Sequence, residues 1–337
     1  MVGVPVKNYA IVVSACKKYV PELTALLNSL ERIGNVHDVH INGFNLPFEF
    51  VAQLDNLSYS VFHHPISEAD AREFGGESEI LCRKRYWFAA EWGQFYDSVC
   101  VLDADMIVVR NMDAFFRIAE HGTILGVTLE QKTTYGTDEQ GHDHQRCLGE
   151  HMVKTPTWNT KDMCCTPMFI NAKTYESQLK KAWQIFTEGY PVNNFKAPDQ
   201  QAFNMILVAE DLTKNVVLLP NMCWVGSNEK LLKPYTRVTT QSDGLLWTES
   251  GEPIYIFHGR YYTKKWRNQQ LLNRHGCAQG YLKATECCDA IAEGAMNCLY
   301  EFFKKCLEGP IVVDTTIEYT TDGLPDHTYA DLGKEVV

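Results

Sequence analysis

The sequence lacks the features that mark several large classes of protein. Lys and Arg number 31 against 42 Asp and Glu, which gives a net charge of −11, so the basic excess of a nucleic-acid-binding protein is missing. The one basic cluster, Arg83-Lys84-Arg85, is too short to cover a duplex, although it could meet a diphosphate. No apolar run approaches the roughly 18–20 residues needed to cross a bilayer. We therefore expect no nucleic acid as a partner and no transmembrane segment.

Cysteine is plentiful, but its pattern lacks the usual metal and redox motifs. None of the 12 cysteines belongs to a C-x-x-C motif, and adjacent pairs such as Cys164-Cys165 rarely bridge each other. The apolar run Ala10–Cys16 is too short for a signal peptide. These observations predict reduced, mostly buried thiols and a cytoplasmic location.

A glycine-rich phosphate loop is missing as well. The run Tyr9–Cys16 predicts a first strand, and the leucine spacing within Pro21–Leu30 predicts a helix after it. A strand, a loop and a helix are the usual opening of a nucleotide-binding α/β unit. Because no G-x-G-x-x-G or P-loop motif lies between them, neither a Rossmann dinucleotide site nor a P-loop is expected. With 337 residues, 45% of them hydrophobic, the chain can bury the core of a large α/β domain.

The most informative stretch is Val99–Val109, an apolar run interrupted by Asp103 and Asp105. Unpaired charges are costly in the middle of a buried strand, so we expect one strand to end at Leu102 and a second to begin at Met106. In open α/β sheets, ligands bind at the carboxyl ends of the strands. Residues two apart in extended chain point the same way, so both carboxylates can converge on one cation. Oxygen ligands of this kind suit Mg²⁺ or Mn²⁺.

The same Asp-Ala-Asp segment could instead be a turn that caps the strand, but the apolar strand before it favours the metal site. A histidine would be a good third ligand for Mn²⁺ and a poor one for Mg²⁺. His258 stands at the end of the predicted strand Ile254–His258, and Asn171 ends the predicted strand Thr166–Asn171. Polar residues therefore end three predicted strands.

Two further features have a simpler structural interpretation. His63-His64 follows the predicted strand Tyr59–Phe62, and we expect the pair in a loop at the strand end rather than in a set of ligands. Asp199 precedes the predicted helix Gln201–Val208, and we expect it to cap that helix whatever else it does.

Five segments, in this order, resemble motifs of glycosyltransferase family 8, the group of glycogenin and the bacterial lipooligosaccharide galactosyltransferases. They are Val101–Asp105 for the D-x-D metal motif, Arg110–Phe116 for N-x-D-x-L-F, Phe169–Ala172 for F-N-A/S-G, Asp199–Asn204 for D-Q-x-x-x-N, and His258–Trp266 for H-x-x-G-x-x-K-P-W. With the first strand and helix, the resemblance covers about residues 9–268. Each motif alone is a weak or moderate signal, and their shared order makes the resemblance specific.

The resemblance implies a GT-A fold. Residues 1–270 would form an α/β catalytic domain, with a central, mostly parallel Rossmann-like sheet flanked by helices. Residues 271–337 would form a helical C-terminal extension with a polar tail. The implied reaction is the retaining transfer of a hexose from a UDP-sugar, with UDP-glucose and UDP-galactose favoured, to a hydroxyl of a glycan or glycoprotein acceptor. The prediction allows a homodimer.

The resemblance also implies roles for individual residues. Asp103, Asp105 and His258 would hold Mn²⁺, with Mg²⁺ as the alternative. Lys264, and secondarily Arg85, would stabilise the leaving phosphate. The sugar of the donor would contact Asn171, Asp199 and Gln200. The nucleotide would contact Ser14, Ala15, Tyr19 and Ala104.

Three other functions stand beside this one. A sugar nucleotidyltransferase also uses a metal at an Asp strand end, but it usually has a Gly-rich loop after the first strand, and Ser14–Tyr19 contains no glycine. A glycogenin-like primer would carry the sugar on itself, and its intact mass after incubation with the donor would show this. A binding module without activity is disfavoured, because all three metal-ligand residues are present.

Overall fold

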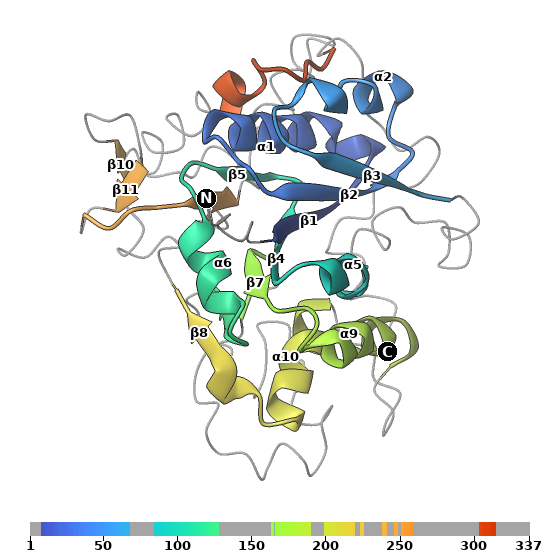
Figure 1. Ribbon diagram of the computed structural model, residues 1–337, viewed down its shortest axis with the longest axis vertical. Helices are drawn as coiled ribbons and strands as arrows, with labels where there is room; N and C mark the ends of the chain where they lie inside the picture. Colours follow the sequence, from blue (N-terminus) through green and yellow to red (C-terminus); the bar gives the residue numbers. More distant parts are fainter. Residues whose placement is uncertain are drawn as a thin grey trace, which may run out of the picture.

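The computed structural model describes residues 8–67, 84–127, 163–164, 166–189, 199–219, 223–225, 238–240, 246–248, 251–258 and 303–314. Its centre is a seven-stranded sheet (Figure 1). In spatial order the strands are β3 (Val61–Ile66), β2 (Asp38–Phe44), β1 (Tyr9–Cys16), β4 (Ser98–Asp103), β7 (Met168–Ile170), β6 (Ile124–Gly126) and β8 (Val216–Leu218).

The sheet is mostly parallel, which confirms the predicted α/β class. The pairs β1–β2, β2–β3, β1–β4 and β6–β8 are parallel. Strand β7 is the exception, because it runs antiparallel to both β4 and β6. Its reversed direction decides which of its ends lies beside the carboxyl end of β4.

Two small sheets flank the central one. Strand β12 (Ile256–His258) pairs antiparallel with β5 (Met106–Val108) and parallel with β9 (Cys223–Val225). Strands β10 (Val238–Thr240) and β11 (Leu246–Thr248) form an antiparallel pair. The strand predicted to restart at Met106 is therefore confirmed, and it belongs to a different sheet from the strand that ends at Asp103.

Helices cover both faces of the central sheet (Figure 1). They are α1 (Val20–Arg32), the single turn α2 (Phe48–Val51), α5 (Arg85–Trp92), α6 (Asp113–Ala119), α9 (Glu176–Glu188) and α10 (Asp199–Ala209). None of the described helices is long and apolar enough to span a membrane.

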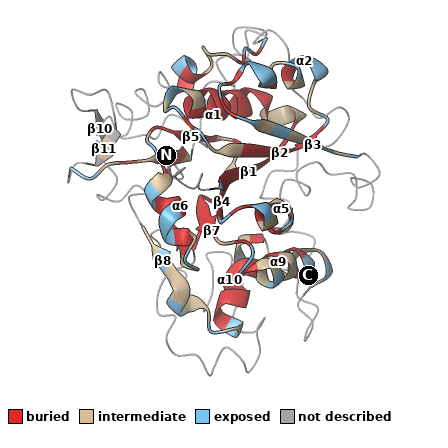
Figure 2. Cartoon of the chain, in the orientation of Figure 1, coloured by how far each residue is buried: buried red, intermediate tan, exposed pale blue. Residues whose placement is uncertain are grey.

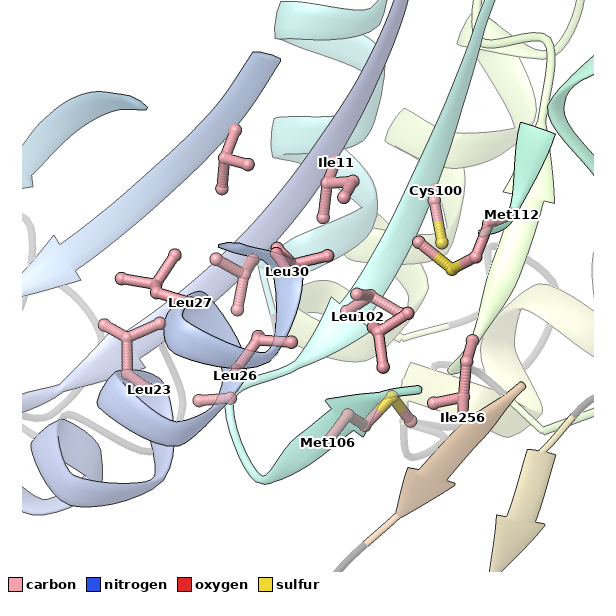
Figure 3. Close-up of a cluster of buried hydrophobic side chains, with 14 of the residues drawn as sticks. Ile11, Leu23, Leu26, Leu27, Leu30, Cys100, Leu102, Met106, Met112 and Ile256 are labelled. Carbon is pink, nitrogen blue, oxygen red and sulfur yellow. The ribbon is translucent and has the colours of Figure 1, made fainter. Parts of the chain in front are cut away.

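Side chains alternate along each strand, and most of the described core accordingly falls into two clusters. Buried residues, red in Figure 2, lie on the strands and on the helices that cover them. On β1, Ile11 and Val13 pack with the leucines of α1, as the close-up shows for Ile11 (Figure 3). Ala10 and Val12 face the opposite side and pack with residues of α5, α9 and α10. Burying apolar surface on both faces is what holds the parallel strands in place.

The segment 303–314 docks on the α1 face, next to α2 (Figure 1). Asn28 of α1 is 1% exposed, and its Nδ2 donates to the carbonyls of Cys306 (2.9 Å) and Ile311 (2.8 Å). Its Oδ1 accepts from the Ile311 N–H at 3.1 Å. Gln53 makes a more exposed pair of bonds with the backbone of Val312. Most of the predicted extension, residues 271–337, lies outside the described residues.

We expect Asn28→Ala to lower the free energy of unfolding by about 2–4 kcal/mol, because it leaves buried backbone groups of the docked segment without partners. Urea unfolding followed by circular dichroism measures the loss. Gln53→Ala is the matched control, since water can replace its exposed bonds, and it should cost less than about 1 kcal/mol. Equal losses in the two variants would contradict this account of the docking.

The histidine pair lies within β3, so its predicted position in a loop is wrong. His64 stacks on Trp92 of α5, with ring centroids 3.8 Å apart. Its Nε2 is 2.9 Å from Nδ1 of His40, whose Nε2 is 2.8 Å from the Tyr96 hydroxyl. That hydroxyl donates to Asp38. The strand continues through His64 because its partners come from β2 and from α5, which a pattern of hydrophobicity does not show.

Burial, together with the neighbouring His64, lowers the pKa of His40 to about 4, although Asp38 opposes the shift. The unfolded chain would take up this proton near pH 6.5, so stability is complete above that pH and is lost as the pH falls from 6.5 towards 4. We expect His40→Gln to remove up to roughly 3 kcal/mol of this pH dependence. Thermal unfolding of both proteins from pH 4.5 to 7.5 tests it, and parallel profiles would contradict it.

Candidate metal centre

The two aspartates lie at the carboxyl end of β4, where the sequence predicted them. Asp103 is the last residue of β4, a turn follows, and Asp105 precedes β5. Both carboxylates are only partly exposed, at 24% and 17% of the side chain. Ala104, between them, is buried.

His258 joins them from the other end of the chain. It pairs with Met106 across β12 and β5, which places its ring over the turn. Its Nε2 lies 3.3 Å from Oδ2 of Asp103 and 3.3 Å from Oδ1 of Asp105. The three ligand atoms all lie within 4.8 Å of one another. Ligands with bonds of about 2.1 Å to one octahedral ion lie about 3 Å apart, so the set fits a small divalent cation.

Charges and hydrogen bonds shift the pKa values of Asp103 and His258. Burial alone would raise the pKa of Asp103, but the Arg85 charge, His258 and the Thr166 hydroxyl outweigh it and hold the pKa well below its usual range. Burial alone would lower the pKa of His258, but Asp105 and Asp103 raise it to about 10. A positive charge is therefore favoured at the point where the three side chains meet.

Arg85 links this centre to a third carboxylate. It is the first residue of α5, and its Nη1 forms an ion pair with Oδ1 of Asp103. Its Nε lies 3.0 Å from Oδ2 of Asp199, the first residue of α10. Only 12% of the Arg85 side chain and 5% of the Asp199 side chain are exposed. The guanidinium thus bridges the buried carboxylate of Asp199 and the partly exposed carboxylate of Asp103, which are far apart in the sequence.

A row of polar side chains crosses the sheet beside Asp103. Ser14 of β1 is the register partner of Asp103 and of Asn42, and Asn42 is the partner of His64. The Ser14 hydroxyl is buried and has no hydrogen-bond partner among the described residues. Asn42 accepts a hydrogen bond from the Trp92 indole at 2.9 Å. The row runs under α5 at the edge where the expected nucleotide-binding residues lie.

The other residues expected at the nucleotide also lie at this edge. Ala15 is fully buried at the end of β1. Tyr19 follows in the 3₁₀ turn Lys17–Tyr19 and packs against Cys16 and Phe44. The structure therefore brings Ser14, Ala15 and Tyr19 to the same edge as Asp103.

The prediction that Asn171 contacts the sugar is wrong. Strand β7 is antiparallel to β4, with Ile170 opposite Val99, so Asn171 lies at the amino end of β4. Along β4 that end is about 16 Å from Asp103. The Asn171 side chain instead donates to the Glu120 carbonyl (2.9 Å) and accepts from the Thr174 N–H (3.1 Å). The prediction failed because a hydrophobic pattern does not reveal the direction of a strand.

The same reversal brings in a residue that the sequence did not single out. Met168 opposes Val101, so Thr166, two residues earlier, lies beside Asp103, two residues later. The Thr166 hydroxyl donates to Oδ2 of Asp103 at 2.6 Å. Thr166 could have been identified from the sequence only if the direction of β7 relative to β4 had been known.

The remaining predicted residues are placed less directly. Gln200 is the second residue of α10, next to Asp199, and is partly buried. Asn204 of the same helix bonds the backbone N–H and carbonyl of Met163, which ties α10 to the segment before β7. Lys264 lies outside the described residues.

Comparison with solved structures identifies the fold. The apo structure of the bifunctional glycosyltransferase WbbM matches 68% of this chain and 41% of its own, with a TM-score of 0.50 and 15% identity. The chain has the GT-A fold. At this identity the likeness concerns the fold alone, and the chain spans less than half of WbbM.

Two further GT-A structures match less closely. The galactosyltransferase LgtC, in complex with donor and acceptor sugar analogues, matches 85% of this chain and 95% of its own, with a TM-score of 0.49 and 14% identity. The glycosyltransferase GlyE of Streptococcus pneumoniae TIGR4 matches 64% of this chain and 46% of its own, with a TM-score of 0.40 and 16% identity. No protein-family model and no curated protein sequence matches the chain.

We expect Arg85→Met to lower the free energy of unfolding of the metal-free protein by about 3–5 kcal/mol, because Asp103 and Asp199 lose the charge that compensates their burial. Urea unfolding in the presence of EDTA measures the loss. Lys214→Met is the control, since its ion pair with Asp211 is mostly exposed and should contribute little. A loss as small as that of the control would show that the Arg85 pairs do not hold α5 and α10 together.

Proposed function

We propose that the protein is a metal-dependent glycosyltransferase that moves a sugar from a nucleotide-sugar donor to a hydroxyl of an acceptor. The convergence of Asp103, Asp105 and His258 within 4.8 Å of one another, at the carboxyl end of β4 in a GT-A fold, is the observation that carries this proposal. Ligands of α/β sheets bind at this edge.

The donor set suits the metal and the charge of the site. Two carboxylates and one imidazole favour Mn²⁺, with Mg²⁺ as the alternative. When bound, a divalent cation supplies Lewis-acid stabilisation of the charge that develops on the leaving diphosphate. His258 must give up its proton to serve as a ligand. The cation and Arg85 would then balance the negative charges of Asp103, Asp105 and Asp199.

The side chains around the metal centre would bind and orient the donor. Arg85 lies against Asp103, where it can meet the diphosphate as well as hold the ligand in place. Lys264 would add a second positive charge on the leaving phosphate. Asp199 and Gln200, at the start of α10, would contact the sugar, while Ser14, Ala15, Tyr19 and Ala104 would contact the nucleotide.

The resemblance of the motifs supports a more specific form of the proposal. The donor would be a UDP-hexose, UDP-glucose or UDP-galactose, and the acceptor a glycan or glycoprotein hydroxyl. Transfer would retain the anomeric configuration, with no protein nucleophile required. We also retain the cytoplasmic location and the homodimer as proposals.

The test is donor hydrolysis by the EDTA-treated protein, with a panel of nucleotide sugars and with or without added Mn²⁺, reading the release of nucleoside diphosphate. We expect Mn²⁺-dependent release from one UDP-sugar. Asp103→Asn and Asp105→Asn should lower the rate at least ~10²-fold, because neither carboxylate can be replaced in a small ligand set.

Asp97→Asn is the matched control, since Asp97 is exposed at the opposite end of β4 and should leave the rate unchanged. Release from a GDP- or TDP-sugar would support the proposed reaction but contradict the proposal that the base of the donor is uracil. If no nucleoside diphosphate is released and no nucleotide shifts the thermal unfolding of the protein, the proposal that the protein is a glycosyltransferase is wrong. An increase in the protein's own intact mass would instead identify a self-glycosylating primer.

A further inference from the structure

We infer that Thr166 is a positioning residue of the metal centre, whose hydroxyl fixes the Asp103 carboxylate in the orientation that binds the cation. The inference rests on the proposed metal-dependent function. The inference adds a residue to the proposed site. Thr166 is not one of the three metal ligands and lies in none of the motifs identified in the sequence.

The contacts of the Asp103 carboxylate carry the inference. Oδ1 is held by the Arg85 guanidinium, which comes from α5. Oδ2 accepts the Thr166 hydroxyl at 2.6 Å and lies 3.3 Å from Nε2 of His258. Each carboxylate oxygen offers two lone pairs, so Oδ2 can keep the Thr166 bond and still bind a cation. Rotation of the carboxylate would break a bond on either side.

Thr166 is itself held rigidly. It is fully buried, and a β-branched side chain has few rotamers. Two residues later β7 begins with Met168, which is fully buried and paired with Val101 of β4. The pairing of β7 with β4 thus fixes the position of the Thr166 hydroxyl relative to Asp103. The hydrogen bond from this hydroxyl therefore holds the Asp103 carboxylate in one orientation.

Thr166 also differs from the other two partners of Asp103 in what happens when a cation arrives. As a ligand, His258 would offer its Nε2 lone pair to the cation and would no longer donate to Asp103. Arg85 carries a charge that a bound diphosphate would attract. The neutral Thr166 hydroxyl has no competing partner of this kind, so it would keep the carboxylate oriented when the site is loaded.

A purely structural role makes a different forecast. If the hydroxyl only satisfied a buried carboxylate, removing it would lower stability and leave the affinity for the cation unchanged. Outer-shell hydrogen bonds to metal ligands typically change affinity 10–100-fold when they are removed. The affinity for the metal alone therefore separates the two roles.

The experiment titrates the EDTA-treated full chain with Mn²⁺, following free Mn²⁺ by electron paramagnetic resonance. We expect Thr166→Val to weaken Mn²⁺ binding about 10–100-fold. Thr166→Ser keeps the hydroxyl and should restore most of the affinity. In donor hydrolysis, the Mn²⁺ concentration for half-maximal rate should rise in parallel for Thr166→Val, with a smaller change at saturating Mn²⁺.

Thr187→Val is the matched control, because its hydroxyl bonds a carbonyl within α9 and should leave binding unchanged. Thr166→Ala replaces the valine variant if that variant does not fold. Equal Mn²⁺ affinity of the wild type and the hydroxyl-free variant would overturn the inference alone. Failure of the wild type to bind Mn²⁺ would overturn the proposed function and the inference together.

Discussion

A carboxylate that is largely removed from water must be compensated by charge and hydrogen bonds, and Asp103 is the residue on which this requirement falls. Its partners come from three separate parts of the chain: Arg85 from α5, Thr166 from the approach to β7, and His258 from β12. Through Arg85 the same compensation reaches Asp199 at the start of α10. The cost of leaving this one carboxylate unpaired therefore links strands of the central sheet, a strand of a flanking sheet, and the helices α5 and α10.

A polar centre of this kind lies at the carboxyl ends of the strands, beyond the part of each strand that is buried on both faces. On the face of β1 that meets α5, Ala10 and Val12 belong to the apolar cluster, and two residues later the same face presents Ser14. On β4 the sequence runs in the same way from Val99 and Val101 to Asp103. The apolar part of each strand supplies the burial that stabilises the fold, and its last residue carries the chemistry. Since parallel strands end at one edge, the polar ends gather there.

The sequence predicted those parts of the site that depend on local pattern. Asp103 and Asp105 could be placed because an apolar strand stopped at them, and His258 because it ended another apolar run. The Asn171 prediction failed because the apolar composition of β7 shows that the strand is buried but does not show whether it runs parallel or antiparallel to β4. Thr166 was missed for the same reason. The bridge from Arg85 to Asp103 and Asp199 joins two helices and a strand, and only the packing of α5 beside α10 and β4 shows it.

The docking of residues 303–314 on α1 sets a condition on folding during synthesis. The contact from Asn28 to Ile311 spans 283 positions, and Ile311 and Val313 belong to the same apolar cluster as Leu27 and Leu30. At about 5–20 residues per second, a ribosome needs on the order of 15–60 s to pass from one side of this contact to the other. Throughout that interval the face of α1 that these residues cover stays open to water or to a chaperone. This surface of α1 is thus made early in synthesis and covered only after Ile311 has been added.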